Sequence, residues 1–127
     1  MHDVTIISET ALEQVLELDR LSGGGLFARV VDIYLAETPT ILRDLRSAID
    51  AGDPDRAAVA AHALKSASMN VGAQGVATVC TELEALGRRG SVDGAESLAL
   101  QLDEAYPLVK AALERRVLKH TAEAFGG

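Results

Sequence analysis

The stretch that decides the fold spans residues 26–50 and reads LFARVVDIYLAETPTILRDLRSAID. Its apolar positions recur in alternating steps of four and three, the spacing that places side chains on one face of an α-helix. This face comprises Phe27, Val31, Tyr34, Thr38, Ile41, Leu45 and Ala48. Proline lacks an N–H group, so we expect a kink or a split at Pro39. The face keeps its phase across Pro39, which favours a kink in one long helix.

Helix-breaking residues divide the rest of the chain into further helical segments. The five predicted helices cover about residues 10–22, 26–50, 54–71, 73 to the turn at 87–90, and 92–118. Thr10 and Glu13 have the spacing of a capping box for the first helix, and Asp53-Pro54 is typical of a helix start. Pro107 predicts a second kink. Residues 119–127 show no apolar face, so we expect a flexible tail.

Amphipathic helices with short connections pack as antiparallel bundles. We therefore predict an all-α fold, an antiparallel up-and-down four-helix bundle with an additional short N-terminal helix across one end. Residues 1–127 form one domain, with a core over about 8–118. A chain of this size can close its core as a monomer.

Composition supports this fold and excludes several functions. The chain has 127 residues, of which 48% are hydrophobic and only 3% aromatic, and its net charge is −7. An acidic surface repels nucleic acids and anionic membranes, so neither is an expected partner. The N-terminus lacks the pattern of a secretory signal, and no apolar run is long enough to span a bilayer. We expect a cytoplasmic protein.

The predicted third helix carries the residues that indicate a function. Each helical residue advances by about 100°, and by this rule one apolar stripe lies opposite His62. The stripe comprises Ala57, Ala60, Leu64, Ala67 and Val71. His62 should therefore point to solvent, with Lys65 one turn onward. Its other neighbours on the exposed face are Ala58, Val59, Ser66 and Met69.

Other reactive side chains are more simply structural. Cys80 lies on an apolar stripe without a basic neighbour, as a buried thiol does. The three histidines are far apart in the chain, and no phosphate-binding loop is present, so we expect neither a metal site nor ATP binding. Glu82 and Glu84 are interpreted as part of a solvated face. The Arg88-Arg89 turn is plain surface or orients an acidic partner.

The third helix resembles a known family. His62-Ala63-Leu64-Lys65, followed by small residues and then Gly72-Ala73, is similar to the signature of histidine-containing phosphotransfer domains. The similarity extends over roughly residues 12–113, including Cys80-Thr81-Glu82-Leu83-Glu84. One position departs from the family pattern, because Ser66 stands where glycine is usual. A serine there is expected either to narrow the approach to His62 or to hydrogen-bond a helix carbonyl or a phosphoryl oxygen.

This resemblance implies a phosphorelay. His62 would accept a phosphoryl group from a receiver-domain aspartate and pass it to another, and Lys65 would stabilise it. Ala58, Val59, Ser66 and Met69 would form part of the docking surface. The implied partners are response-regulator receiver domains and a hybrid histidine kinase. This chain would need no cofactor, because the receiver supplies the magnesium ion, and it would have no autokinase activity.

Two other functions compete with this interpretation. The first is a helical adaptor that binds receiver domains without carrying phosphate, which Ser66 alone favours. The second is the dimerisation domain of a histidine kinase. That domain would have an acidic residue after the histidine, where this chain has Ala63, and an ATPase domain would follow it.

Overall fold

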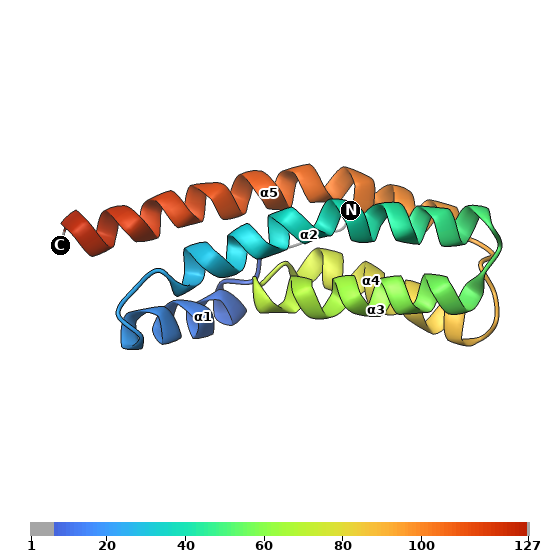
Figure 1. Ribbon diagram of the computed structural model, residues 1–127, viewed down its shortest axis with the longest axis horizontal. Coiled ribbons are helices and arrows are strands. Elements are labelled where there is room, and N and C mark those ends of the chain that lie inside the picture. The colour runs from blue at the N-terminus through green and yellow to red at the C-terminus, as the bar shows by residue number, and fades with distance from the viewer. Residues whose placement is uncertain (1–6, 127) are drawn as a thin grey trace.

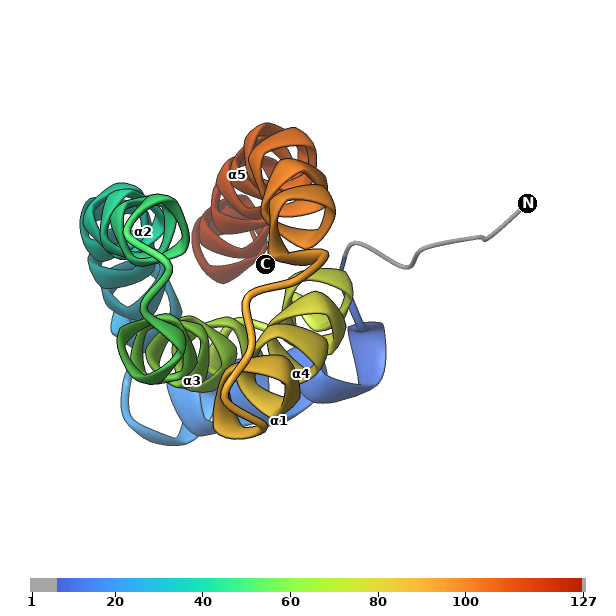
Figure 2. The same cartoon turned by 90° about the vertical axis from the view of Figure 1, so that its right-hand side faces the viewer.

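The computed structural model describes residues 7–126, with side chains to residue 123. Within this range there are five helices and no strand: α1 (Glu9–Leu21), α2 (Leu26–Asp50), α3 (Pro54–Asn70), α4 (Gln74–Arg88) and α5 (Ala95–Gly126). Seen end-on, α2, α3, α4 and α5 occupy the four corners of a bundle (Figure 2). The α1 helix lies beyond the end of α3, beside the start of α2 (Figure 1). The predicted all-α bundle is confirmed.

The helix ends differ from the prediction in three places. Ser8 rather than Thr10 caps α1, because its hydroxyl accepts the backbone N–H of Ala11 at 3.3 Å. The α5 helix begins at Ala95 rather than Val92. It also continues to Gly126, so residues 119–126 of the expected tail are helical, and residue 127 lies outside the described residues. No helix of residues 7–126 is long and apolar enough to cross a membrane.

Pro39 does not split α2, and a neighbouring helix supplies a donor to the carbonyl that proline leaves without its usual partner. Without an N–H group, Pro39 cannot donate to the carbonyl of Leu35, four residues earlier. The hydroxyl of Tyr106 on α5 donates to that same carbonyl at 3.3 Å. Helix α2 remains one element and is tied to α5 at its proline.

The core lies between the four bundle helices. Helix α3 packs against both α2 and α4, and its inward side chains are small. The buried residues of α3 are Ala57, Ala58, Ala60, Ala61, Leu64 and Ser68. Large aliphatic and aromatic side chains from the other helices fill the remaining space, among them Leu12, Phe27, Leu45, Leu83, Leu102 and Leu113. The alanine-rich face lets α3 approach its neighbours closely.

A buried junction joins α1, α2 and α5. The carboxylate of Asp19, 2% exposed, accepts the backbone N–H of Phe27 at 2.9 Å and a hydrogen bond from Nε2 of His120. Burial alone would raise the pKa of Asp19, but bonds from His120 and from the backbone of Phe27 and Leu26 outweigh burial and lower it. The His120 ring also packs edge-on against Phe27. These contacts attach the last turns of α5 to α1 and α2. The sequence of these turns shows no apolar face that would have predicted the contact.

Candidate functional site

His62 projects outward from the middle of α3. Its side chain is 55% exposed, as the helical periodicity predicted. Among the contacts of residues 7–123, one edge of the ring is bound: Nδ1 lies 3.0 Å from a carboxylate oxygen of Glu84 on α4. Since an ionised carboxylate can only accept, Nδ1 carries the ring proton and donates it to Glu84. In the neutral ring, the lone pair then lies on the second nitrogen, Nε2, which can act as a nucleophile.

Glu84 is the centre of a charged cluster. Its carboxylate accepts hydrogen bonds from Nζ of Lys65 at 2.6 Å and from the Arg88 guanidinium at 2.6 and 3.0 Å, besides the bond from His62. Bonds from Lys65, Arg88 and His62 lower the pKa of Glu84 to about 2, although burial opposes this. Glu84 thus stays ionised at any physiological pH. The expectation that Glu84 belongs to a solvated face is wrong, because its residue is 7% exposed.

Close contact between α3 and α4 places Glu84 beside His62. Gly87 lies inside α4, one turn beyond Glu84. A Cβ atom at Gly87 would lie 2.6 Å from the carbonyl oxygen of Pro54 and 2.9 Å from Cβ of Ala58. Only glycine allows the backbones of α3 and α4 to come this close, because a Cβ atom at those distances would lie far inside van der Waals contact. The end of α4 therefore rests directly on the start of α3.

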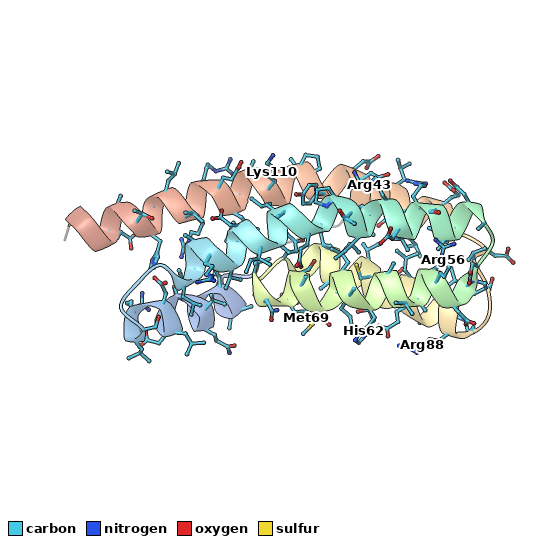
Figure 3. All side chains as sticks on the ribbon, in the orientation of Figure 1. Arg43, Arg56, His62, Met69, Arg88 and Lys110 are labelled. Atoms are coloured by element: carbon cyan, nitrogen blue, oxygen red, sulfur yellow. The ribbon has the colours of Figure 1, made fainter. Side chains whose placement is uncertain are left out.

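This contact corrects one predicted site residue. Ala58 was expected on the docking surface with Val59, Ser66 and Met69, but it is only 5% exposed because Gly87 covers it. Val59 and Met69 are exposed by 70% and 61%, and Ser66 is also exposed. Met69, His62 and Arg88 follow one edge of the molecule (Figure 3). The accessible surface around His62 therefore excludes Ala58 and retains the other three residues.

The sequence carried a signal for Glu84 that the interpretation of the acidic residues as a solvated face overlooked. Glu84 follows Cys80 by four residues, so it lies on the same stripe of α4. Cys80 is fully buried, and burial raises the pKa of its thiol to about 12, as befits a structural thiol. An acidic residue on a buried stripe needs a positive partner. Lys65 and Arg88 are those partners.

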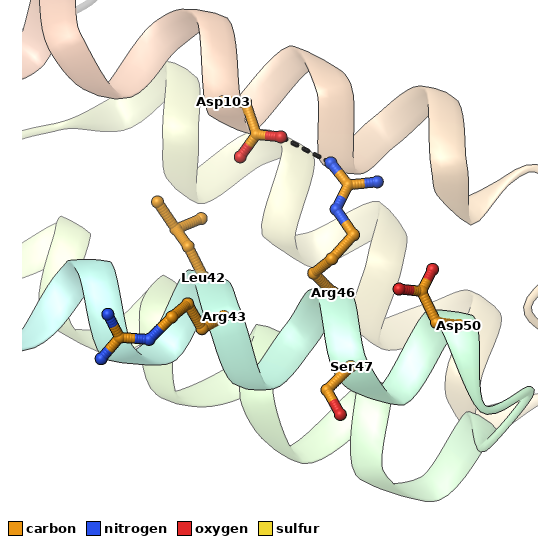
Figure 4. Close-up of a pocket in the computed structure, with 6 residues that line it drawn as sticks. All are labelled: Leu42, Arg43, Arg46, Ser47, Asp50 and Asp103. Atoms are coloured by element: carbon orange, nitrogen blue, oxygen red, sulfur yellow. Dashed lines mark hydrogen bonds and ion pairs between the residues drawn. The ribbon is translucent and has the colours of Figure 1, made fainter.

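An open hollow lies elsewhere, between α2 and α5, lined by Leu42, Arg43, Arg46, Ser47, Asp50 and Asp103 (Figure 4). Arg46 crosses it and pairs with Asp103 and Glu96 of α5. These ion pairs satisfy the guanidinium and tie α2 to α5. None of the residues around His62 lines this hollow, so we assign it a structural role.

The fold and site define a class of protein: a helical bundle that presents a histidine on an exposed face, beside a buried carboxylate. Residues 29–114 match the Hpt domain family, so the chain belongs to the Hpt domain family. A solved structure with the same fold is histidine-containing phosphotransfer protein B (HptB) from Pseudomonas aeruginosa PAO1. The two share 25% sequence identity and a TM-score of 0.80 over 92% of this chain and 98% of that chain. No curated protein sequence matches this chain.

Proposed function

We propose that this Hpt protein is a phosphorelay intermediary in two-component signalling, with His62 as the phosphoryl carrier. It accepts a phosphoryl group from a receiver-domain aspartate and passes it to another receiver-domain aspartate. The observation that carries this proposal is the exposed His62 ring with Nδ1 bound to a buried carboxylate at 3.0 Å. In the neutral ring, that bond keeps the proton on Nδ1, so the lone pair lies on Nε2, where an in-line approach is possible.

The transfer step follows from the ring chemistry. The lone pair of Nε2 attacks the phosphorus of the aspartyl phosphate, the Nε2–P bond forms, and the P–O bond to the aspartate breaks. The aspartate leaves as a carboxylate. The His62 ring now carries both a proton on Nδ1 and a phosphoryl group on Nε2, so it is positively charged. Glu84 stabilises that charge, and in the return step neutral imidazole is the leaving group.

Lys65 and Arg88 supply the positive charge of the site. Glu84 binds both side chains before phosphorylation. Lys65 lies one turn from His62, so its ammonium can leave Glu84 for a phosphoryl oxygen while Arg88 continues to neutralise the carboxylate. Lys65 therefore stabilises the phosphorylated state without leaving an unpaired buried charge.

The partner docks on the exposed face of α3. Val59, Ser66 and Met69 surround His62 there, and their burial by a receiver domain excludes water from the transfer. The receiver supplies the acidic pocket and the magnesium ion that bind the phosphoryl group, and a hybrid histidine kinase supplies the phosphate. This chain contributes no ATP site and no autokinase activity, and it acts in the cytoplasm as a monomer.

The test is transfer from a phosphorylated receiver domain in the presence of magnesium, comparing the wild type with His62→Gln. Phosphohistidine is labile in acid and stable in alkali, which distinguishes it from phosphoserine and aspartyl phosphate. We expect such label on the wild type only. His62 contributes little to the core, so the His62→Gln variant should keep its helical circular dichroism spectrum.

The competing function predicts a different result. A helical adaptor would bind the receiver without taking up label. Binding with no label from any of several receivers would refute the carrier proposal, and label retained by His62→Gln would show that another residue carries the phosphate.

A further inference from the structure

The orientation of the His62 ring fixes the side of the site that the reacting nitrogen faces. Nδ1 is directed at Glu84 on α4. In an imidazole ring, Nε2 lies on the edge opposite Nδ1, next to Cδ2. Nε2, and any phosphoryl group bonded to it, is therefore directed away from α4 and from the carboxylate of Glu84.

The neighbours of His62 on α3 fall on two different sides. Lys65 binds Glu84 and Ala58 approaches Gly87, so both lie on the α4 side. Each helical residue advances by about 100°, so Lys65 lies about 60° around α3 from His62, toward α4. Ser66 lies about 40° from His62 in the other direction, away from α4. Val59 shares the side of Ser66. Of these neighbours, Ser66 is the one that brings a hydrogen-bond donor to the side of Nε2.

The Ser66 hydroxyl is also available. In α4, the hydroxyls of Thr78 and Thr81 each donate to the carbonyl four residues earlier at 3.0 Å. Ser66 is exposed and makes no such bond within residues 7–123. Helical side chains lean toward the N-terminus, and Ser66 lies one turn after His62. Its hydroxyl therefore leans over the turn from which the imidazole projects.

We propose that Ser66 is a phosphoryl-binding residue, whose hydroxyl donates a hydrogen bond to an oxygen of the phosphoryl group on Nε2 of His62. This inference rests on the proposed function, since it requires that His62 is phosphorylated. It divides the site in two. Before phosphorylation, Glu84 with Lys65 and Arg88 holds the Nδ1 side of the ring. After phosphorylation, Ser66 contacts the phosphoryl group from the Nε2 side, and the Lys65 ammonium, released from Glu84, reaches it from the α4 side.

The test avoids any dependence on an unidentified receiver. Phosphoramidate phosphorylates the protein directly: its P–N bond breaks, the Nε2–P bond forms, and ammonia leaves. The phosphorus NMR signal of His62 is then followed against pH in the wild type, Ser66→Ala, Ser66→Gly and Ser66→Thr. A hydrogen bond to the dianionic phosphoryl group favours its charged form. Its loss should raise the midpoint of the phosphorus signal by about 0.5 pH unit, a threefold change in proton affinity.

The four proteins distinguish an effect of the hydroxyl group from an effect of side-chain size. We expect the raised midpoint in Ser66→Ala and Ser66→Gly, and the wild-type midpoint in Ser66→Thr, which keeps the hydroxyl. Equal midpoints in all four proteins would overturn the inference, as would a change confined to Ser66→Gly. Absence of a phosphohistidine signal from the wild type, with His62→Gln as control, would instead refute the proposed function.

Discussion

Replacing Glu84 with glutamine removes the charge at the centre of the site and keeps the shape of the side chain. In the folded protein the pKa of Glu84 is about 2 rather than 4.5. At about 1.4 kcal/mol per pH unit, this difference sets an upper limit of roughly 3.5 kcal/mol on its contribution to stability. Arg88 is 64% exposed, so solvent screens much of its share. We expect Glu84→Gln to lose about 1–2 kcal/mol at pH 7, which lowers Tm by about 3–8 °C.

The pH dependence gives this prediction a second readout. A carboxyl group whose pKa is lowered on folding stabilises the protein above its unfolded pKa, and that contribution disappears as pH falls through the folded pKa. The gap between the wild type and Glu84→Gln should therefore be full at pH 7 and narrow between pH 4.5 and about 2. Urea denaturation at pH 7 and pH 3 measures it. Glu82→Gln is the matched control, because Glu82 is exposed on the same helix and should change little.

The same substitution should slow phosphotransfer. Glutamine does not hold the proton on Nδ1 as a carboxylate does, so Nε2 is less often the free nucleophile. We expect transfer from a phosphorylated receiver to slow about tenfold, equivalent to roughly 1.4 kcal/mol on the barrier. A Glu84→Gln protein that matches the wild type in stability at pH 7, or keeps a constant gap down to pH 3, would refute the assigned charge cluster. Unchanged transfer would refute the role of Glu84 in positioning the ring.

Three further substitutions test other parts of the structure. Gly87→Ala should lower the free energy of unfolding by about 1–3 kcal/mol in urea titrations, because the added methyl group collides with Ala58, and wild-type stability would contradict that contact. His120→Ala should cost about 2 kcal/mol by leaving the buried Asp19 carboxylate short of a donor. Its phosphotransfer rate should stay at the wild-type value, and a slower rate would mean that the junction affects the site. Lys65→Met should shorten the lifetime of the phosphorylated protein, measured by loss of alkali-stable label, and an unchanged lifetime would exclude contact with the phosphoryl group.

Helical periodicity predicted the exposed His62 but could not decide which neighbours stay accessible. Ala58 and Ser66 are each about 40° from His62 around α3, on opposite sides. Periodicity measures only that angle, so it treated the two alike. The Gly87 contact covers Ala58 and brings Glu84 in on that side, whereas Ser66 remains exposed. Such a contact depends on the placement of α4 against α3, which no pattern within one helix encodes.

The difference between a pattern within one helix and a contact between helices also explains the helix ends. Each predicted bundle helix contains its own apolar face, which suffices to identify it. The end of α5 has no such face, and its order depends on His120 reaching Asp19, 101 residues away in the chain. The hydrogen bond from Tyr106 to the Leu35 carbonyl, which Pro39 cannot reach, likewise joins residues far apart in the chain. Contacts between distant residues decide these features, and a single sequence does not reveal them.

Helix α3 packs with one face and presents His62 on the other. This arrangement affects how duplicated copies of the protein can diverge. Val59 and Met69 are more than half exposed, so replacing them changes the surface seen by a partner with little effect on packing. Partner choice can therefore be rewritten by a few substitutions while the fold stays intact. Duplicated copies of such a protein can be insulated from each other's signalling pathways in this way, by introducing residues that clash with the wrong receiver.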